Sequence, residues 1–185
     1  MLGVADLKED AVQDTSSPDP ETTMLLSYLD AQRRHVLGIL EGLDEEALHR
    51  PVLPSGWSCA GLVRHLALDV ERFWFRGVVA GEKAVIDAAL TGPDDAWKVG
   101  PEVSAKGVLD LYRQETALAD AVITSTAPSA APAWWPTELF GPDGGILDLR
   151  EAILHVTVET ACHAGHLDAV RELIDGRKWL VLTES

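Results

Sequence analysis

The sequence predicts an all-α protein, a four-helix bundle whose helices are joined by long crossing connections. Apolar residues recur three or four positions apart in four long segments of the 185-residue chain, which is the spacing of one buried helix face. Helix-capping residues precede these segments, and no segment alternates apolar and polar residues for long, as a half-buried strand would. Packing four apolar faces around one core is then the simplest architecture.

The first expected helix begins at Asp19 and Pro20. Asp is a favoured cap residue, and a proline in the first turn of a helix costs no hydrogen bond. Residues 1–18 mix charges, Ser and Pro without apolar periodicity, so we expect a flexible N-terminal tail and one helical domain over residues 19–185. The apolar stripe of this helix consists of Leu26, Leu29, Val36, Leu40 and Leu43.

The second and third helices are each expected to begin at a capping serine. Ser58 follows a loop rich in Pro and Gly, and the helix after it should run to about Val79, before Gly81. Ser104 has the same role for the third helix. The apolar positions of that helix are Val108, Leu111, Tyr112, Leu118 and Val122.

The fourth helix follows a long irregular connection over residues 125–145, which is rich in Ala, Pro and Gly. Asp148 and Glu151 have the spacing of a capping box, in which each residue satisfies a backbone N–H of the first turn. The helix is expected to continue to Asp175, because Gly176 is a typical residue just beyond a helix end.

Composition and charge restrict the classes of function. The chain carries 15 basic and 30 acidic residues, a net charge of −15 that repels nucleic-acid phosphates and anionic lipids. We therefore expect neither nucleic acid nor a membrane as a partner. No apolar run is long enough to span a bilayer and the acidic N-terminus lacks a signal-peptide layout, so the expected location is cytoplasmic. Cys59 and Cys162 show no CxxC spacing, which indicates neither a disulfide framework nor a cysteine zinc site.

Three polar residues, Glu159, His163 and His166, share one face of the fourth helix. At about 100° per residue, Glu159 and His163 lie about 40° apart around the helix axis and one turn apart along it. The apolar stripe passes through the same region, so these groups need hydrogen bonds, ion pairs or coordination to offset their desolvation. A divalent metal ion would supply such a partner.

A second helix must complete such a site, because two residues four apart reach only one side of an ion. His65 lies among the apolar residues of the second helix, with Asp69 one turn later to orient its ring or bind water. The expected metal ligands are therefore His65, Glu159 and His163, with His166 and Asp69 as supporting catalytic groups. Zn²⁺ is the first choice for two histidines and one carboxylate, and Ni²⁺, Mn²⁺ or Fe²⁺ fit the same set.

Each of these patterns also has a plainer interpretation. A histidine on an apolar helix face is usually hydrogen-bonded within the core, and Glu and His four positions apart also occur as ordinary surface pairs. Cys162 is either a reactive thiol or a packing residue, and Cys59 is expected to be a packing residue. Trp134 and Trp135 either form the wall of a ligand site or anchor their loop to the core.

Two motifs resemble the DinB-like superfamily, in particular its mycothiol transferase-like branch. The segment SGWSCAGLVRHLALDVERFWF is similar to the second-helix pattern of this branch, and HVTVETACHAGHLDAVRELIDG is similar to its fourth-helix signature. The resemblance covers nearly the whole chain. It implies a DinB-like four-helix bundle in which one histidine of the second helix and two residues four apart on the fourth bind a metal ion. These positions correspond to His65, Glu159 and His163.

The resemblance also implies an activity. Related enzymes use the metal to activate the thiol of mycothiol or bacillithiol, and the branch is associated with actinobacteria. We therefore expect a metal-dependent thiol S-transferase that joins mycothiol to a small electrophile through a thioether. Two alternatives stay open: a metal-dependent hydrolase that uses bound water, and a non-enzymatic metal-binding stress protein. The sequence also leaves the electrophile and the oligomeric state open, a homodimer included.

Overall fold

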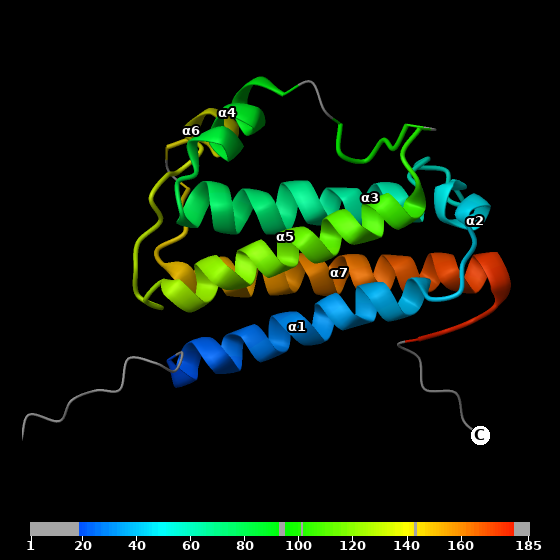
Figure 1. Ribbon diagram of the computed structural model, residues 1–185, viewed down its shortest axis with the longest axis horizontal. Helices are drawn as coiled ribbons and strands as arrows, with labels where there is room; N and C mark the ends of the chain where they lie inside the picture. The colour runs from blue at the N-terminus through cyan, green and yellow to red at the C-terminus, as the bar shows by residue number, and fades with distance from the viewer. Residues whose placement is uncertain (1–18, 93–94, 101, 143, 180–185) are drawn as a thin grey trace, which may run out of the picture.

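The computed structural model describes residues 19–92, 95–100, 102–142 and 144–179. Over these ranges the chain folds into helices and contains no strand, which confirms the all-α prediction. Four long helical rods lie side by side along the long axis of the molecule (Figure 1). The tail expected over residues 1–18 lies outside the described residues. No helix in the described ranges has the length and apolar character needed to cross a membrane.

Helix α1 (Pro20–Leu40) begins as predicted. The Asp19 carboxylate accepts hydrogen bonds from the backbone N–H groups of Glu21 at 2.8 Å and Thr22 at 3.4 Å. These groups have no partner within the first turn, so the cap replaces the bonds that the helix itself does not provide. The fully buried members of the predicted apolar stripe are Leu29, Val36 and Leu40.

Helix α3 (Cys59–His65) continues without a break into η1 (Leu66–Val79), so one rod covers the second predicted helix. The sequence predicted the extent of this helix and not its winding: η1 is a π-helix with i→i+5 hydrogen bonds. The buried residues of η1 form four groups along the rod: Leu66 and Ala67, Val70 and Glu71, Phe73 to Phe75, and Gly77 to Val79.

Helix α7 (Leu149–Asp175) has both predicted ends. Asp148 accepts a hydrogen bond from the backbone N–H of Glu151 at 3.1 Å, and the Glu151 carboxylate accepts one from the N–H of Leu147 at 2.7 Å. The capping box therefore closes one residue earlier than its usual pattern. Gly176 ends the helix with a φ of 78°, the left-handed conformation that glycine adopts most easily.

Helix α5 (Ala105–Ser125) begins after its predicted serine cap. The prediction that Leu118 lies in the core was wrong. Leu118 is 37% exposed, whereas Glu115 is only 1% exposed. Glu115 stays inside because its two oxygens bind Arg72 at 2.6 Å and Arg76 at 2.8 Å, both from η1. An apolar pattern overlooks such a residue, because its burial depends on partners from another helix.

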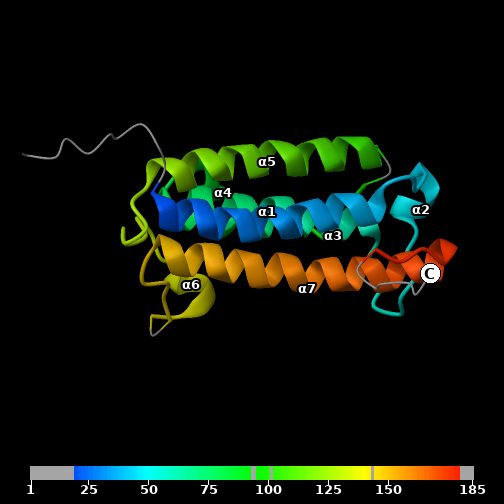
Figure 2. The ribbon, with the colours of Figure 1, turned by 90° about the horizontal axis from the view of Figure 1, so that it is seen from below.

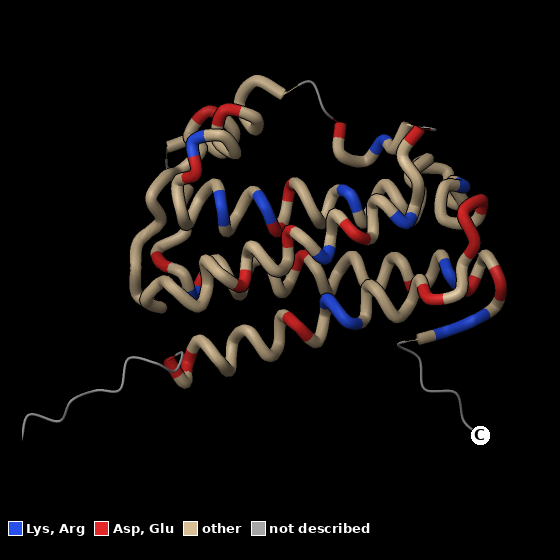
Figure 3. Tube along the Cα trace, in the orientation of Figure 1, with Lys and Arg blue, Asp and Glu red and all other residues tan. Residues whose placement is uncertain are grey.

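Positively and negatively charged residues are interspersed along the long helices (Figure 3), and a second network of such residues joins α1, η1 and α5. Arg33 donates through Nε and Nη2 to both carboxylate oxygens of Glu71 at 2.7 Å, and through Nη1 to Asp120 at 2.7 Å and Asp30 at 2.8 Å. Burial raises the pKa of Glu71, although Arg33 opposes this by bonding its charged form. Loss of Arg33 would leave the Glu71 carboxylate in the core without the cation that compensates it.

Three short helices lie within the connections between the long ones: α2 (Glu45–His49), α4 (Lys83–Thr91) and α6 (Thr137–Phe140). Each is too short to present the repeated apolar stripe that marks a helix in the sequence. Asp44 caps α2 by accepting a hydrogen bond from the N–H of Ala47 at 2.8 Å.

The long helices run in an up, down, down, up order. α1 and α7 point in one direction, and the α3–η1 rod and α5 point in the other (Figure 1). Because η1 and α5 are parallel, the end of η1 and the start of α5 lie at opposite ends of the molecule, which confirms the predicted crossing connection. Viewed from below, α1 lies along both α5 and α7 (Figure 2). The α3–η1 rod completes the bundle by packing on α5 and α7.

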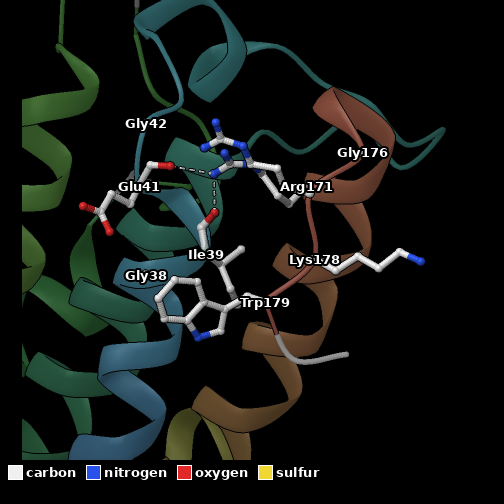
Figure 4. A pocket seen from close by; sticks show the side chains of 9 residues that line it. Gly38, Ile39, Glu41, Gly42, Arg171, Gly176, Lys178 and Trp179 are labelled. Atoms are coloured by element: carbon white, nitrogen blue, oxygen red, sulfur yellow. Dashed lines mark hydrogen bonds between the residues drawn. The ribbon is translucent and has the colours of Figure 1, made fainter. Parts of the chain in front are cut away.

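The chain after α7 turns back along α1 (Figure 4). The Trp179 ring lies so close to Gly38 that a Cβ there would be 2.4 Å from a ring carbon, so this approach requires glycine. The cleft beside the ring has a volume of about 760 Å³. Its cations are already paired, Arg171 and Arg177 with Asp175 and Lys178 with Glu172. Arg171 donates to the backbone oxygens of Ile39 at 2.5 Å and Glu41 at 2.9 Å. We assign this cleft to the packing of the C-terminal segment.

Candidate metal centre

His65 and His163 meet where α3 passes α7. Their ring centroids are 5.2 Å apart and their planes are inclined by 77°. Only 16% of the His65 side chain and 13% of the His163 side chain are exposed. The fold therefore brings two imidazoles from two helices together in a place that water reaches poorly.

Each ring has a polar neighbour at Nδ1. His65 Nδ1 lies 2.8 Å from Oδ2 of Asp69, and His163 Nδ1 lies 3.4 Å from Nδ1 of His166. A carboxylate beside Nδ1 favours the tautomer with the proton on that atom, which leaves the lone pair of Nε2 for another partner. The two residues predicted as supporting groups thus lie against the two predicted imidazole ligands.

Glu159 lies one turn before His163 on α7. Its Oε2 is 3.6 Å from Nε2 of His163, the nitrogen opposite the one that faces His166. The Glu159 side chain is 42% exposed, so it can change rotamer without displacing core residues. The third predicted ligand therefore lies beside His163.

The electrostatics of the cluster favour a neutral His163 ring. Burial, together with the charge that His65 would carry, lowers the pKa of His163 below its ordinary 6.5, although Glu159 acts to raise it. The neutral form of His163 therefore dominates near pH 7. Neutral imidazole is the form that coordinates metals, so the ring needs no further proton loss to act as a ligand.

The donor set fits a divalent metal, although the side chains do not form a closed ligand shell. In the part of the chain that the structure describes, no three His, Cys, Asp or Glu side chains are grouped closely enough to hold a metal ion. Two imidazoles and one carboxylate are nevertheless the donor types of many catalytic zinc sites. The carboxylate at Nδ1 of His65 is also the usual outer support of such a ligand.

Residues 24–176 match the family model described as Mycothiol-S-transferase. The match extends from α1 to the end of α7 and includes all five residues of the cluster. The chain belongs to the mycothiol-S-transferase family. The resemblance drawn from the second-helix and fourth-helix motifs is thereby confirmed. A search of curated proteins found no match.

Trp97 is a member of the site that the sequence does not reveal. In this mycothiol-S-transferase family member its ring stacks on His65, with centroids 4.2 Å apart and planes inclined by 20°. Its edge also lies against His163, at 5.6 Å between centroids. Trp97 therefore covers both imidazoles and limits their contact with water.

Two residues of α3 hold the loop that carries Trp97. Nη1 of Arg64 donates to the backbone oxygens of Asp95 at 3.1 Å and Lys98 at 3.2 Å. A Cβ at Gly61 would lie within 2.1 Å of the Trp97 backbone oxygen, so only glycine allows the loop to approach the helix this closely. The crossing connection is thus fastened directly beside His65.

The two cysteines have different environments. Cys59 is completely buried, and this burial raises the pKa of its thiol to about 11. A thiol with so high a pKa is unreactive at neutral pH, which agrees with the packing role expected for Cys59. Cys162 is exposed on α7, next to His163 in the chain.

Trp134 and Trp135 lie away from His65 and His163, at the far end of η1. Trp134 meets Phe73 edge-on at 6.0 Å, and its backbone N–H donates to the Val78 oxygen at 3.1 Å. Trp134 therefore anchors its loop, one of the two roles considered from the sequence. Trp135 lies beside Trp74, at 6.3 Å between ring centroids, and lines a separate cleft.

Proposed function

We propose that the chain is a metal-dependent S-transferase that joins a low-molecular-weight thiol, mycothiol, to a small electrophile. The observation that carries this proposal is the close approach of His65 and His163 from two helices, in a chain of the mycothiol-S-transferase family. His65, Glu159 and His163 are the residues that we assign to metal binding. A divalent metal held there would supply Lewis acidity that lowers the pKa of a thiol.

The supporting residues have separate tasks in this proposal. Asp69 fixes the orientation and tautomer of His65 through the 2.8 Å contact at Nδ1. Trp97 excludes water from the two rings, which strengthens electrostatic interactions beneath it. His166 is exposed and touches His163, so we assign it to proton exchange between the site and solvent.

The reaction assigned to the site is a nucleophilic substitution or addition at carbon. The thiol loses its proton to His166 or solvent, and its sulfur forms a C–S bond with the electrophilic carbon. A leaving group departs with its bonding electrons, or the electrophile takes up a proton if the step is an addition. The product is a thioether conjugate of the thiol.

Conjugation of mycothiol with the fluorogenic electrophile monochlorobimane tests the proposal. We expect fluorescent conjugate to form with zinc-loaded protein at a rate at least tenfold above that of His65→Ala and of metal-stripped protein. Equal rates in all three samples would contradict metal-dependent thiol transfer. Hydrolysis of an ester substrate that is metal-dependent and insensitive to mycothiol would favour the hydrolase instead.

A further inference from the structure

An apolar cleft lies between the start of α7, the end of η1 and the loop around α6. Its volume is about 580 Å³, within the range of sites for small organic molecules. Six aromatic or apolar side chains line it along with a histidine: Trp74, Trp135, Phe140, Ile146, Leu154, Val158 and His155. None of these residues belongs to the histidine cluster.

The aromatic rings form a preorganised wall. Phe140 stacks on Trp74, with centroids 5.9 Å apart and planes inclined by 11°, and Trp135 lies 5.7 Å from Phe140. Phe140 and Val158 are 53% and 68% exposed, although both are large apolar residues. Aromatic faces left open at a concave site bind flat apolar groups by stacking and by release of water.

The charge of the lining narrows the class of ligand. Among the described residues that line the cleft there is no Lys or Arg, and Glu151 is the one carboxylate. Glu151 already accepts a hydrogen bond from the Leu147 N–H at 2.7 Å. An anion would meet this carboxylate without a compensating cation, so the cleft suits an uncharged molecule.

The cleft adjoins the histidine cluster along the same two helices. The rings of His155 and Trp74 are 4.3 Å apart. This is a second ring contact between α7 and the α3–η1 rod, further along than the contact of His163 with His65. His155 lies two turns before His163 on α7, or about 12 Å at 1.5 Å per residue. Glu159 lies one turn from each. A molecule that fills the cleft and reacts at the cluster must therefore be elongated.

We infer that this cleft binds the uncharged aromatic end of the electrophile whose reactive carbon is attacked at His65 and His163. The inference rests on the proposed function, because it assigns the cleft to a substrate of that reaction. In a test reaction with an iodoacetamide, the thiolate sulfur bonds to the CH₂ carbon and iodide departs with the C–I electrons. The thiol proton passes to the buffer.

Two electrophiles with the same reacting group test the inference. Zinc-loaded protein and mycothiol are assayed with iodoacetamide and with N-(1-naphthyl)iodoacetamide, after subtraction of the uncatalysed rates. We expect kcat/KM to be at least tenfold higher for the naphthyl compound. Phe140→Ala should lower the ratio of the two kcat/KM values at least fivefold. Gly145→Leu should lower the same ratio by filling the cleft, since no atom lies within 4 Å of a Cβ at Gly145. Leu173→Ala, at a 62% exposed apolar residue of α7 outside the cleft, should keep the ratio.

The outcomes separate the two proposals. Turnover of both compounds with equal kcat/KM, or an unchanged ratio in both cleft variants, overturns the inference and leaves the proposed function intact. Absence of turnover with either compound overturns the proposed function. In that case titration with the uncharged fluorescent probe N-phenyl-1-naphthylamine still decides whether the cleft binds aromatic molecules, because it requires neither metal nor thiol. Saturable binding weakened in Phe140→Ala supports a binding cleft, and absence of binding excludes it.

Discussion

His65 and His163 differ from the other histidines of the described chain in having an aromatic cover and a polar neighbour at the same time. Trp97 contacts both rings, while Asp69 and His166 each contact one. Helix spacing in the sequence predicts which polar residues share a face, and all five predicted site residues lie in this cluster. Helix spacing could not predict Trp97, because this residue lies on an irregular loop whose position depends on the crossing connection.

Alanine substitution separates the proposed ligands from their neighbours. His65→Ala and His163→Ala should each lower bound zinc to less than a fifth of the wild-type value, because each removes one of the three proposed donors. His166→Ala should retain most of the metal. Elemental analysis of protein reconstituted with zinc and then desalted measures the content, with His49→Ala, at a histidine paired with Glu45, as the control. Full retention in the first two variants would contradict the ligand assignment.

Asp69→Asn tests the carboxylate at Nδ1 of His65. The amide keeps the size of the side chain but weakens the charge-assisted hydrogen bond at 2.8 Å. We expect zinc affinity to fall about 10–100-fold, as for other carboxylates that support a ligating histidine. Competition with a chromogenic chelator measures the dissociation constant. Asp87→Asn, at an exposed ion pair with Lys83, should leave the dissociation constant unchanged. An equal loss of zinc affinity in Asp87→Asn would show that the change in net charge causes the effect.

At the level of single elements, the extent of the helices was more predictable than their winding and their buried charges. Caps and glycines mark helix ends locally, so the starts of α1, α3, α5 and α7 agree with the sequence. The spacing of apolar residues does not distinguish the π-winding of η1 from an α-helix. Burial of Glu115 depends on two arginines of η1, about forty positions earlier in the chain.

Glu115→Gln should destabilise the bundle by about 2 kcal/mol, less than the ~3–5 kcal/mol of a fully buried broken pair, because both arginines are partly exposed. Burial acts to raise the pKa of Glu115, but hydrogen bonds and charges from Arg72 and Arg76 hold it below the ordinary 4.5. The folded state thus binds this proton less tightly than the unfolded state. Its stabilisation is complete above about pH 4.5 and is lost as the pH falls below that value.

Urea unfolding at several pH values measures both effects. The variant should be less stable than wild type at pH 7, and the difference should shrink as the pH falls below 4.5. Glu46→Gln, at an exposed carboxylate, is the matched control and should change stability by less than about 0.5 kcal/mol. A difference between Glu115→Gln and wild type that grows toward acid pH would contradict the sign of the argument.

At the scale of the whole molecule, the up, down, down, up order decides which residues can meet. It places α3 beside α7 and sends residues 80–104 back across the bundle, so that Trp97 covers the two histidines. The sequence predicted four helices and long connections, because these follow from local periodicity. It could not predict the contact of the C-terminal segment with α1, which joins Trp179 to Gly38.

Gly38→Ala tests that contact. Replacing a helical glycine with alanine normally stabilises by about 0.5–1 kcal/mol, but the new Cβ would lie 2.4 Å from the Trp179 ring. We expect no gain in Tm and faster tryptic cleavage at Arg177 and Lys178, because the ring must leave its place. Gly165→Ala, with no atom within 4 Å of the added Cβ, should raise Tm and leave cleavage unchanged. Identical behaviour of the two variants would contradict the packing role of Trp179.

Metal-dependent thiol binding is tested most directly by isothermal titration of zinc-loaded protein with mycothiol, beside the same titration of metal-stripped protein. Thiol deprotonation on binding would release a proton, so the heat should vary with the ionisation enthalpy of the buffer. We predict saturable, proton-releasing binding to the zinc-loaded protein and none to the stripped protein. No binding to protein that carries one zinc per chain, or equal binding with and without zinc, would contradict thiol activation at His65, Glu159 and His163.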